Sequence, residues 1–231
     1  MSKLLDAFDK NPLTLIVSLP SNSVELARAA LKGGAQALKV HLNITHAASG
    51  TMFGDFKAEK NVIRDILKAA DVPVGVVPGE EKLPTQNEME ELISMGIDFF
   101  DINVKYLPEW MLGLKKIGKM ASVDESYSID EIIKYKELGV DALEAAIVPK
   151  SHYGKELIVG DLTQYITLST ASHLPVVIPT QKKVAISEVP IVWDTGAKAL
   201  MIGAIVTGRT VKSIEKTTKE YRFAVDDLGN D

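Results

Sequence analysis

The sequence predicts a single α/β domain over residues 1–231, in which eight parallel β-strands alternate with helices and close into a (βα)8 barrel after a short N-terminal helix. Three observations support this fold class. Eight short apolar runs typical of buried strands alternate with helical patterns. Two short phrases recur in alternation along the chain. The length of 231 residues and the hydrophobic content of 46% suit one barrel or two small domains, and we favour one domain.

Each predicted strand is followed by a helical pattern. The strands are expected at Leu13–Leu19, Ala37–Asn43, Val72–Val77, Phe99–Lys105, Lys119–Asp124, Asp141–Val148, Leu174–Ile178 and Ala199–Ile205. The helices are expected at Val24–Lys32, Lys57–Ala70 and Thr85–Met95, and from about Glu109, Ser128, Asp161, Ser187 and Val211. Thr85 and Glu88 have capping-box spacing. Residues Met1–Lys10 predict the amphipathic N-terminal helix, with Leu4, Leu5 and Phe8 as its apolar side.

The two recurring phrases distinguish a barrel from an open sheet. Before each even-numbered strand stands Gly34-Ala-Gln-Ala-Leu, Gly96-Ile-Asp-Phe-Phe, Gly139-Val-Asp-Ala-Leu or Gly196-Ala-Lys-Ala-Leu. Each of these glycines fits a left-handed position just after a helix. Two odd-numbered strands share Asp71-Val-Pro-Val and His173-Leu-Pro-Val. An alternation of two phrases indicates a repeated pair of βα units, and eight such units with short connections close into a TIM barrel.

Composition narrows the class of partner. The formal charge of -5 argues against nucleic acid as the main partner, and no stretch is long and apolar enough to span a membrane. The chain has no cysteine, which excludes disulfides and thiolate metal sites and fits a reducing, cytoplasmic location. The first ten residues lack an apolar core of signal-peptide length. An outer helix face carrying Trp110 and Met111, or Trp193, is a candidate surface for a homodimer.

Polar residues within the apolar strands identify the candidate site. The outer face of each barrel strand packs on helices, so a polar residue that alternates with apolar ones points into the barrel. Lys39, Asp101, Asp124 and Glu144 are the candidate catalytic residues, with Ser18, His41, Asn103 and Lys105 as substrate-binding neighbours. Ser122 flanks Val123 in the fifth strand. These residues come from five strands and are expected to converge on one mouth.

Charged groups in a low-dielectric interior must pair, because an isolated buried charge is costly. One interpretation is an ion network of Lys39 with Asp101 or Glu144 that only stabilises the barrel. The other is acid/base chemistry at the C-terminal mouth, with Lys39, Asp124 and Glu144 in proton transfer and Asp101 orienting Lys39. A desolvated Lys39 or Lys105 could instead form a Schiff base with a carbonyl substrate, as in an aldolase. His41 is either a hydrogen-bonded core histidine or a participant in the chemistry of the site.

The stretch Ala199–Thr210 predicts a phosphate site. An apolar strand is followed by Gly203 and Gly208, and then by a new helical pattern. Backbone N–H groups at such a turn and the positive end of a helix bind phosphate, commonly after the last two strands of a barrel. The candidate contacts are Gly203, Ala204 and Arg209, with Thr180, Gln181 and Lys182 after the seventh strand. One alternative is that the glycine after the strand is present only for tight strand-to-helix packing. Another is that the ligand carries no phosphate.

Several phrases carry a family resemblance. They are Leu15-Ile-Val-Ser, Lys32-Gly-Gly-Ala, Val72-Pro-Val-Gly, Gly139-Val-Asp-Ala and Met201-Ile-Gly-Ala-Ile. In their order the chain resembles the phosphate-binding barrels of the ribulose-phosphate-binding type, and its layout is most similar to N-acylmannosamine-6-phosphate 2-epimerases. The resemblance implies a TIM barrel, a phosphorylated substrate and an acidic residue near Glu144. The chain departs from those epimerases at Pro78-Gly-Glu-Glu, where they place a catalytic lysine, and at Asp101-Ile-Asn-Val-Lys.

A second comparison concerns metal. Ribulose-phosphate 3-epimerases carry His-x-Asp in strand two, whereas this chain has His41-Leu-Asn43, and strand seven lacks the expected aspartate. The sequence therefore predicts no metal and no cofactor. It favours an isomerase, epimerase or carbon–carbon lyase that works on a small phosphorylated sugar by enolisation. The alternatives are a Schiff-base aldolase and an inactive barrel that serves as a binding or assembly module.

Two connections after strands, Asn43–Phe56 and Pro149–Gly160, are longer than usual and are expected on the C-terminal rim. Their length and their glycines are typical of lids over a site, where His46, His152 and Tyr153 would touch a ligand. The alternative is that both loops are insertions at a subunit contact.

Overall fold

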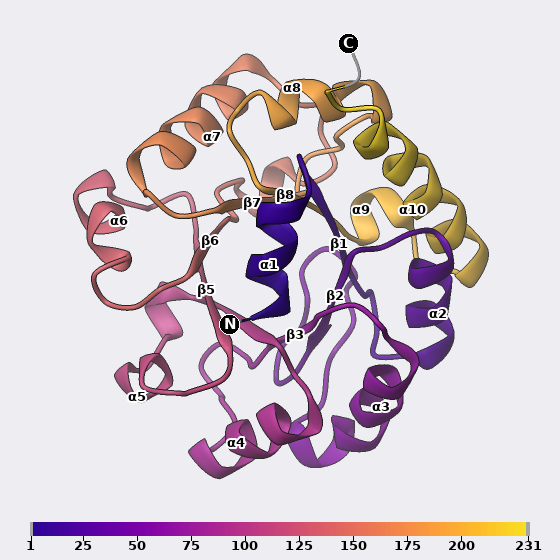
Figure 1. The fold of residues 1–231 in the computed structure, drawn as a ribbon, viewed down its shortest axis with the longest axis vertical. Coiled ribbons are helices and arrows are strands. Elements are labelled where there is room, and N and C mark those ends of the chain that lie inside the picture. Colours follow the sequence, from indigo (N-terminus) through magenta and orange to yellow (C-terminus); the bar gives the residue numbers. More distant parts are fainter. Residues whose placement is uncertain (1, 230–231) are drawn as a thin grey trace.

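Eight parallel strands form a closed barrel in sequence order, with β1 paired to both β2 and β8 (Figure 1). This computed structural model describes residues 2–229, so Met1 of the predicted N-terminal helix lies outside the described residues. The strands are β1 (Thr14–Ser18), β2 (Ala37–His41), β3 (Val74–Val77), β4 (Phe99–Asn103), β5 (Gly118–Val123), β6 (Ala142–Ala145), β7 (Val176–Pro179) and β8 (Ala199–Ile202). The predicted fold class is confirmed, and the strands are shorter than expected at several C-terminal ends.

Helices surround the barrel and one lies across its end (Figure 1). They are α1 (Lys3–Lys10), α2 (Val24–Lys32), α3 (Phe56–Ala69), α4 (Gln86–Met95), α5 (Glu109–Leu112), α6 (Ile129–Tyr135), α7 (Val159–Ala171), α8 (Val189–Trp193), α9 (Ala204–Thr207) and α10 (Val211–Asp226). Three 3-10 turns, η1 (Val104–Tyr106), η2 (Lys150–His152) and η3 (Ile186–Glu188), follow β4, β6 and β7. The capping box of Thr85 and Glu88 forms as predicted.

The turn after β8 differs from the prediction. The strand ends at Ile202 instead of Ile205, and the short helix α9 is inserted before α10. Gly203 has an extended backbone and its carbonyl accepts hydrogen bonds from the N–H groups of Val206 and Thr207, which closes one helical turn. The apolar run therefore divides between a strand and a helix, a distinction that hydrophobicity alone does not make.

The four repeated glycines lie where the phrases predicted them. Gly34, Gly96, Gly139 and Gly196 have φ values of 93°, 114°, 90° and 84°. These left-handed conformations are strained for residues with a Cβ atom, so glycine ends each helix and turns the chain toward the next even-numbered strand. The repeat thus reflects one backbone geometry that is used four times.

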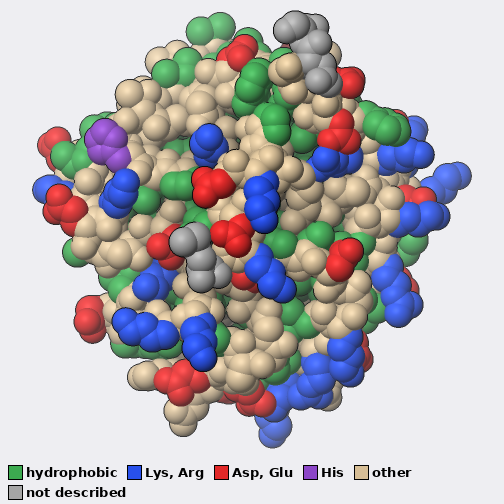
Figure 2. Space-filling view, viewed as in Figure 1, with side chains coloured by type: hydrophobic (Ala, Val, Ile, Leu, Met, Phe, Trp, Pro, Cys, Tyr) green, Lys and Arg blue, Asp and Glu red, His purple; other side chains and the backbone are tan. Residues whose placement is uncertain are grey.

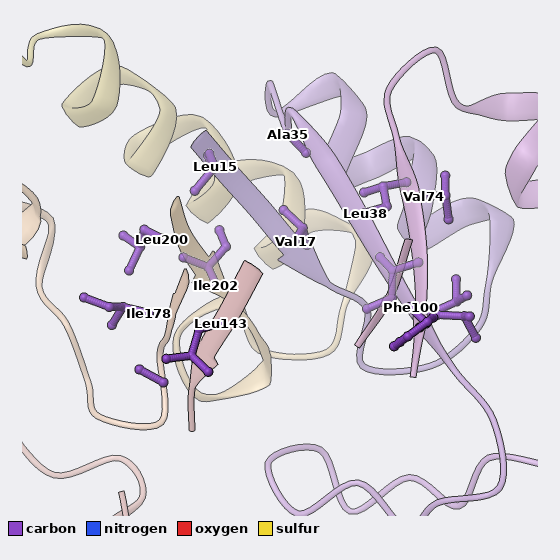
Figure 3. Close-up of a cluster of buried hydrophobic side chains, with 14 of the residues drawn as sticks. Leu15, Val17, Ala35, Leu38, Val74, Phe100, Leu143, Ile178, Leu200 and Ile202 are labelled. Atoms are coloured by element: carbon purple, nitrogen blue, oxygen red, sulfur yellow. The ribbon is translucent and has the colours of Figure 1, made fainter. Parts of the chain in front are cut away.

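The main hydrophobic core lies between the outer face of the strands and the helices. Outward-facing side chains of seven strands are labelled in Figure 3: Leu15, Val17, Leu38, Val74, Phe100, Leu143, Ile178, Leu200 and Ile202. All of them are fully or almost fully buried. Since successive strand residues point to opposite faces, this packing turns the alternate residues into the barrel interior.

The N-terminal half of the barrel interior is apolar and is closed by α1. Leu4 and Phe8 of α1 pack against inward-facing residues of the strands, namely Ile16, Ala37, Phe99, Met120, Ala142, Val177, Ala199 and Met201. The Asp98 carboxylate, just before β4, accepts hydrogen bonds from the backbone N–H groups of Lys3 and Leu4 at 2.8 and 2.9 Å. A carboxylate at a helix N-terminus is stabilising, so Asp98 holds α1 against this end.

Gly75 shows how tightly this half is filled. It pairs with Lys39 on one side and with Phe99 on the other. A Cβ atom added to Gly75 would lie 2.1 Å from the Phe99 ring. The missing side chain of Gly75 therefore provides the space that the Phe99 ring occupies.

The face that α1 covers carries acidic and basic side chains interspersed around its centre (Figure 2). Between residues 2 and 229, no helix combines the length and the hydrophobicity needed to cross a membrane.

Candidate active site

A cavity of about 570 Å³ opens at the C-terminal ends of the strands. Its lining includes eleven of the residues singled out from the sequence: Ser18, Lys39, His41, Asp101, Asn103, Lys105, Asp124, Glu144, Thr180, Gln181 and Gly203. Met201, which belongs to the apolar interior, also lines the cavity. The two-residue period of the strands therefore brings the polar side chains to one mouth above an apolar base.

Lys39 lies at the centre of a buried ion network. Its Nζ atom is 2.6 Å from Asp101 Oδ2 and 3.3 Å from Glu144 Oε2. The three residues are 4%, 1% and 8% exposed. Asp101 Oδ1 accepts no hydrogen bond from a described residue. Two carboxyl groups thus share one ammonium group, which leaves one carboxyl without full charge compensation.

Burial and the charges within the network shift the pKa values of Lys39 and Glu144. Burial raises the pKa of Glu144 well above 4.5, and the Asp101 charge raises it further, while Lys39 lowers it. Burial lowers the pKa of Lys39, but the charges of Asp101 and Glu144 outweigh burial, so its pKa is raised above 10.5. Lys39 is therefore an ammonium group, and Glu144 holds a proton more tightly than an exposed carboxyl does.

Asp124 and Lys105 form a second ion pair nearer the surface. Lys105 Nζ is 2.7 Å from Asp124 Oδ2, and Ser126 donates from its hydroxyl and its backbone N–H to Asp124 Oδ1 at 2.7 and 3.0 Å. Burial raises the pKa of Asp124, but the hydrogen bonds from Lys105 and Ser126 outweigh it and lower the pKa to about 2. A carboxylate that is so weakly basic is a poor proton acceptor near neutral pH. This environment does not favour the expected role of Asp124 in proton transfer.

His41 belongs to a small buried cluster beside Lys39. Its Nε2 atom is 3.3 Å from Ser18 Oγ, and its ring packs on His46 and Phe53 at centroid distances of 4.6 and 4.7 Å. Burial holds the pKa of His41 well below 6.5 and lowers the pKa of His46 to about 4, and the Lys39 charge adds to both shifts. Both rings are therefore neutral near pH 7.

The loop between β2 and α3 brings His46 over His41. Asn43 leaves β2 with a φ of 51°, and the Asn43 N–H donates to the Gly54 carbonyl at 2.8 Å. Thr45 and Met52 form an antiparallel bridge within the loop. Ile44, Thr45, His46, Ala47 and Ala48 line the cavity. The loop is thus an ordered hairpin at the mouth, as the prediction of a rim loop requires.

The ends of β7 and β8 meet beside the cavity. The Gly203 N–H donates to Thr180 Oγ1 at 3.1 Å, so this N–H is already bonded within the protein. The Gln181 side chain is bonded to the loop after β6, through the Val148 N–H and the Ala146 carbonyl. Thr180 therefore keeps its hydroxyl proton available to a ligand, whereas the amide of Gln181 is largely committed to the protein.

Three predicted substrate-binding residues do not line the cavity. Lys182 is 3% exposed, and its Nζ atom is 3.0 Å from Asp161 Oδ2 and 3.3 Å from the Glu156 carbonyl oxygen, behind the loop after β6. Ala204 begins α9, beyond Gly203, where the lining ends. Arg209 lies beside Gly50 of the β2–α3 loop, where an added Cβ atom would be 3.9 Å from Arg209 Nη2.

The lining also contains Ser122, His46 and Tyr153, which the sequence analysis placed in the fifth strand and in the two rim loops. Four further charged or aromatic lining residues were not predicted, namely Glu80, Tyr106, Glu125 and Lys150. These four residues belong to segments that follow strands. The unusual length of the β6–α7 connection, which had already indicated Tyr153, was also the signal for Lys150. Among the described residues, no group of three or more His, Asp or Glu side chains is arranged to hold a metal ion.

Comparison with known proteins supports the fold at the level of class. No protein-family model matches the sequence, and a sequence search of curated proteins finds no match. The solved structures that resemble the chain support its barrel fold.

Three of these neighbours span nearly the whole chain. Thiamine phosphate pyrophosphorylase from Pyrococcus furiosus has a TM-score of 0.68 at 18% identity, covering 95% of this chain and 99% of that one. The open form of tryptophan synthase from M. tuberculosis has a TM-score of 0.69 at 15% identity, covering 97% and 99%. The tryptophan synthase A-subunit from Pyrococcus furiosus has a TM-score of 0.68 at 11% identity. The match covers 92% of this chain and 98% of that one. At such low identities the similarity establishes the fold and leaves the epimerase layout an expectation.

Proposed function

We propose that this barrel is an isomerase that enolises a small phosphorylated sugar, with Glu144 transferring the proton and Lys39 stabilising the enediolate. The observation that carries the proposal is the buried Asp101–Lys39–Glu144 network at the base of the cavity. Barrel interiors are mostly filled with branched aliphatic side chains, and burying charged groups there costs stability. A network that opens onto a cavity is therefore better explained by chemistry than by packing.

The protonation states fit this assignment. A general acid or base is most effective when its pKa lies near the working pH, and the pKa of Glu144 is raised in that direction. Ionised Glu144 takes the proton from the carbon beside the carbonyl. The C–H electron pair then becomes the C=C bond, and the carbonyl oxygen becomes an oxyanion. The Lys39 ammonium group stabilises that oxyanion, and Asp101 holds Lys39 in place.

The spacing of the two groups favours isomerisation over epimerisation. Lys39 Nζ and Glu144 Oε2 are 3.3 Å apart, so the two groups approach a substrate from one side. An epimerase with two proton-transfer groups needs them on opposite faces of one carbon. A single carboxyl group can take a proton from one carbon and return it to the next while the proton of the adjacent hydroxyl group moves to the former carbonyl oxygen. The result is an aldose converted to a ketose, with no net change in atoms or electrons.

Other residues would hold the substrate. We assign its phosphate to the ends of β7 and β8, near Gly203 and the Thr180 hydroxyl, with Lys150 at the mouth adding positive charge. Asp124 would hold Lys105 over the mouth through their 2.7 Å ion pair. The Schiff-base alternative requires a neutral lysine, and the raised pKa values of Lys39 and Lys105 disfavour it.

The test is hydrogen exchange in D₂O with a panel of triose, pentose and hexose phosphates. NMR of the sugar detects deuterium at the carbon beside the carbonyl, whatever the final product is. The wild-type protein should exchange this proton with at least one panel member, and Glu144→Gln should slow the exchange by roughly 10²–10⁴-fold. Glu131→Gln, the same chemical change on the exposed side of α6, should exchange like the wild type.

Two results would count against the proposal. An absence of exchange with every panel member would favour the inactive barrel that binds or assembles without chemistry. Equal exchange by wild type and Glu144→Gln would exclude Glu144 as the proton carrier.

A further inference from the structure

The orientation of the Gln181 side-chain amide is fixed by the backbone. The Val148 N–H donates to Gln181 Oε1 at 3.0 Å, so Oε1 faces this donor. Gln181 Nε2 then donates to the Ala146 carbonyl at 3.2 Å and to the Tyr153 hydroxyl oxygen at 2.7 Å. A flipped amide would bring its NH₂ group against the Val148 N–H and its oxygen against the Ala146 carbonyl. The backbone therefore assigns the donor in the contact with Tyr153.

This contact decides where the Tyr153 proton can point. The Tyr153 oxygen is the acceptor toward Gln181, so its own O–H cannot donate in that direction. Among residues 2–229, the Tyr153 hydroxyl makes no hydrogen bond other than the one that it accepts from Gln181. Tyr153 lines the cavity that contains Lys39 and Glu144, and the charges of both residues act on it. The hydroxyl proton is thus left to a molecule in the cavity.

The loop that carries Tyr153 is held firmly. The Gly154 N–H donates to the Gln181 carbonyl and the Lys183 N–H donates to the Lys155 carbonyl, each at 2.9 Å. Behind the loop, buried Lys182 bonds to the Glu156 carbonyl and to Asp161 at the start of α7. A donor must be held in place before the reaction if it is to stabilise charge that develops during it. These bonds provide that preorganisation.

We propose that Tyr153 is a catalytic residue that donates a hydrogen bond to the oxyanion formed at the substrate carbonyl, and that Gln181 is its positioning residue. This assignment rests on the proposed enolisation and adds a neutral donor to the charged Lys39. It also narrows the substrate class to sugars whose carbonyl oxygen reaches both groups. Burial raises the pKa of Tyr153 above 10, which keeps its hydroxyl protonated at neutral pH.

The test compares two ligands and two reactions. One ligand is a sugar-phosphate hydroxamate, which imitates the enediolate, and the other is the corresponding alditol phosphate, which lacks a carbonyl. Tyr153→Phe should weaken hydroxamate binding about tenfold or more, as expected for a lost hydrogen bond to a charged group, and leave alditol phosphate binding unchanged. In D₂O, the same variant should slow the exchange by roughly 10²–10³-fold. Tyr135→Phe on α6 is the matched control and should behave like the wild type in both assays.

A double mutant tests the positioning role. Gln181→Leu should slow the exchange, but Tyr153→Phe combined with Gln181→Leu should be no slower than Tyr153→Phe alone, because Gln181 acts through Tyr153. A further slowing in the double mutant would overturn this role for Gln181.

The outcomes separate this inference from the proposed function. If Tyr153→Phe binds the hydroxamate and exchanges as well as the wild type while Glu144→Gln does not exchange, the Tyr153 assignment is overturned and the enolisation stands. Equal weakening of hydroxamate and alditol phosphate binding by Tyr153→Phe would also overturn it, because that result indicates a structural role. If the wild type neither exchanges with any sugar phosphate nor binds the hydroxamate, both proposals are overturned.

Discussion

The two halves of the barrel interior are built from the same strands and have opposite chemistry. Toward the N-terminal ends, Phe99, Met120 and their neighbours pack under α1 with no charged group among them. Toward the C-terminal ends, Lys39, Asp101 and Glu144 meet beneath an open cavity. The strand β4 contributes to both halves, because Phe99 and Asp101 are two residues apart and face the same interior.

This difference indicates that the two ends of the barrel interior have different roles. The apolar half is close-packed and contributes stability through burial. The charged half contains groups whose desolvation opposes folding and which a purely structural barrel would not need. Substitutions in the two halves should therefore change the free energy of unfolding by different amounts and, for one residue, in the opposite direction.

The largest effect is expected in the apolar half. Phe99→Ala should lower the free energy of unfolding by roughly 3–5 kcal/mol, because it leaves a cavity beside Gly75 that the strands cannot fill. Urea unfolding followed by circular dichroism measures the change. A loss below about 1 kcal/mol would show that the interior relaxes around the missing ring and is not close-packed.

The next effect concerns the ammonium group of the charged half. Lys39→Met should lower the free energy of unfolding by about 3 kcal/mol, because it leaves the Asp101 charge buried without its partner. Lys134→Met on the exposed side of α6 provides the control and should change stability by less than about 0.5 kcal/mol. A Lys39→Met variant as stable as the wild type would contradict the account of the buried ion network.

Glu144 should produce a smaller effect of opposite sign. Its pKa is raised in the folded protein, so its contribution to stability is fully present below pH 4.5 and is lost as the pH rises through the folded pKa. At higher pH the folded protein must bury an ionised Glu144, which costs stability, and Glu144→Gln removes this cost. The variant should therefore be more stable than the wild type by about 1–2 kcal/mol at pH 8, with little difference near pH 4. Urea titrations at both pH values provide the measurement. A difference that shrinks as the pH rises would contradict the raised pKa.

The smallest effect is expected at the mouth. Asp124→Asn should lower the free energy of unfolding by roughly 0.5 kcal/mol at pH 7, since Lys105 is half exposed and water screens the pair. The pKa of Asp124 is lowered to about 2, so the wild-type advantage is present above pH 3.8 and disappears as the pH falls to about 2. Stability curves of both proteins across this range check the prediction, and a wild-type advantage that persisted below pH 2 would contradict it.

The sequence predicted the barrel and the charged half of its interior because both follow from local rules. Alternation along β2, β4 and β6 is enough to turn Lys39, Asp101 and Glu144 inward. The four repeated glycines have the left-handed geometry that the end of a helix requires. Each of these features depends on residues close together in the chain.

The segments beyond the strand ends were less predictable. After β7 the two-residue period no longer applies, and Lys182 turns toward Asp161 instead of the cavity. The bonds of Gln181 to residues 146, 148 and 153 join parts of the chain that are far apart in sequence. The insertion of α9 and the bond from Gly203 to Thr180 likewise depend on tertiary packing. Side-chain direction in such loops is set by partners that a single sequence does not identify.

The protonation state of Glu144 tests the central claim most directly, since it requires no knowledge of the substrate. Infrared difference spectra between wild type and Glu144→Gln isolate the carboxyl band of this residue during a pH titration. We predict a protonated carboxyl band that persists well above pH 4.5. A Glu144 that ionises near pH 4.5, like an exposed glutamate, would contradict the account.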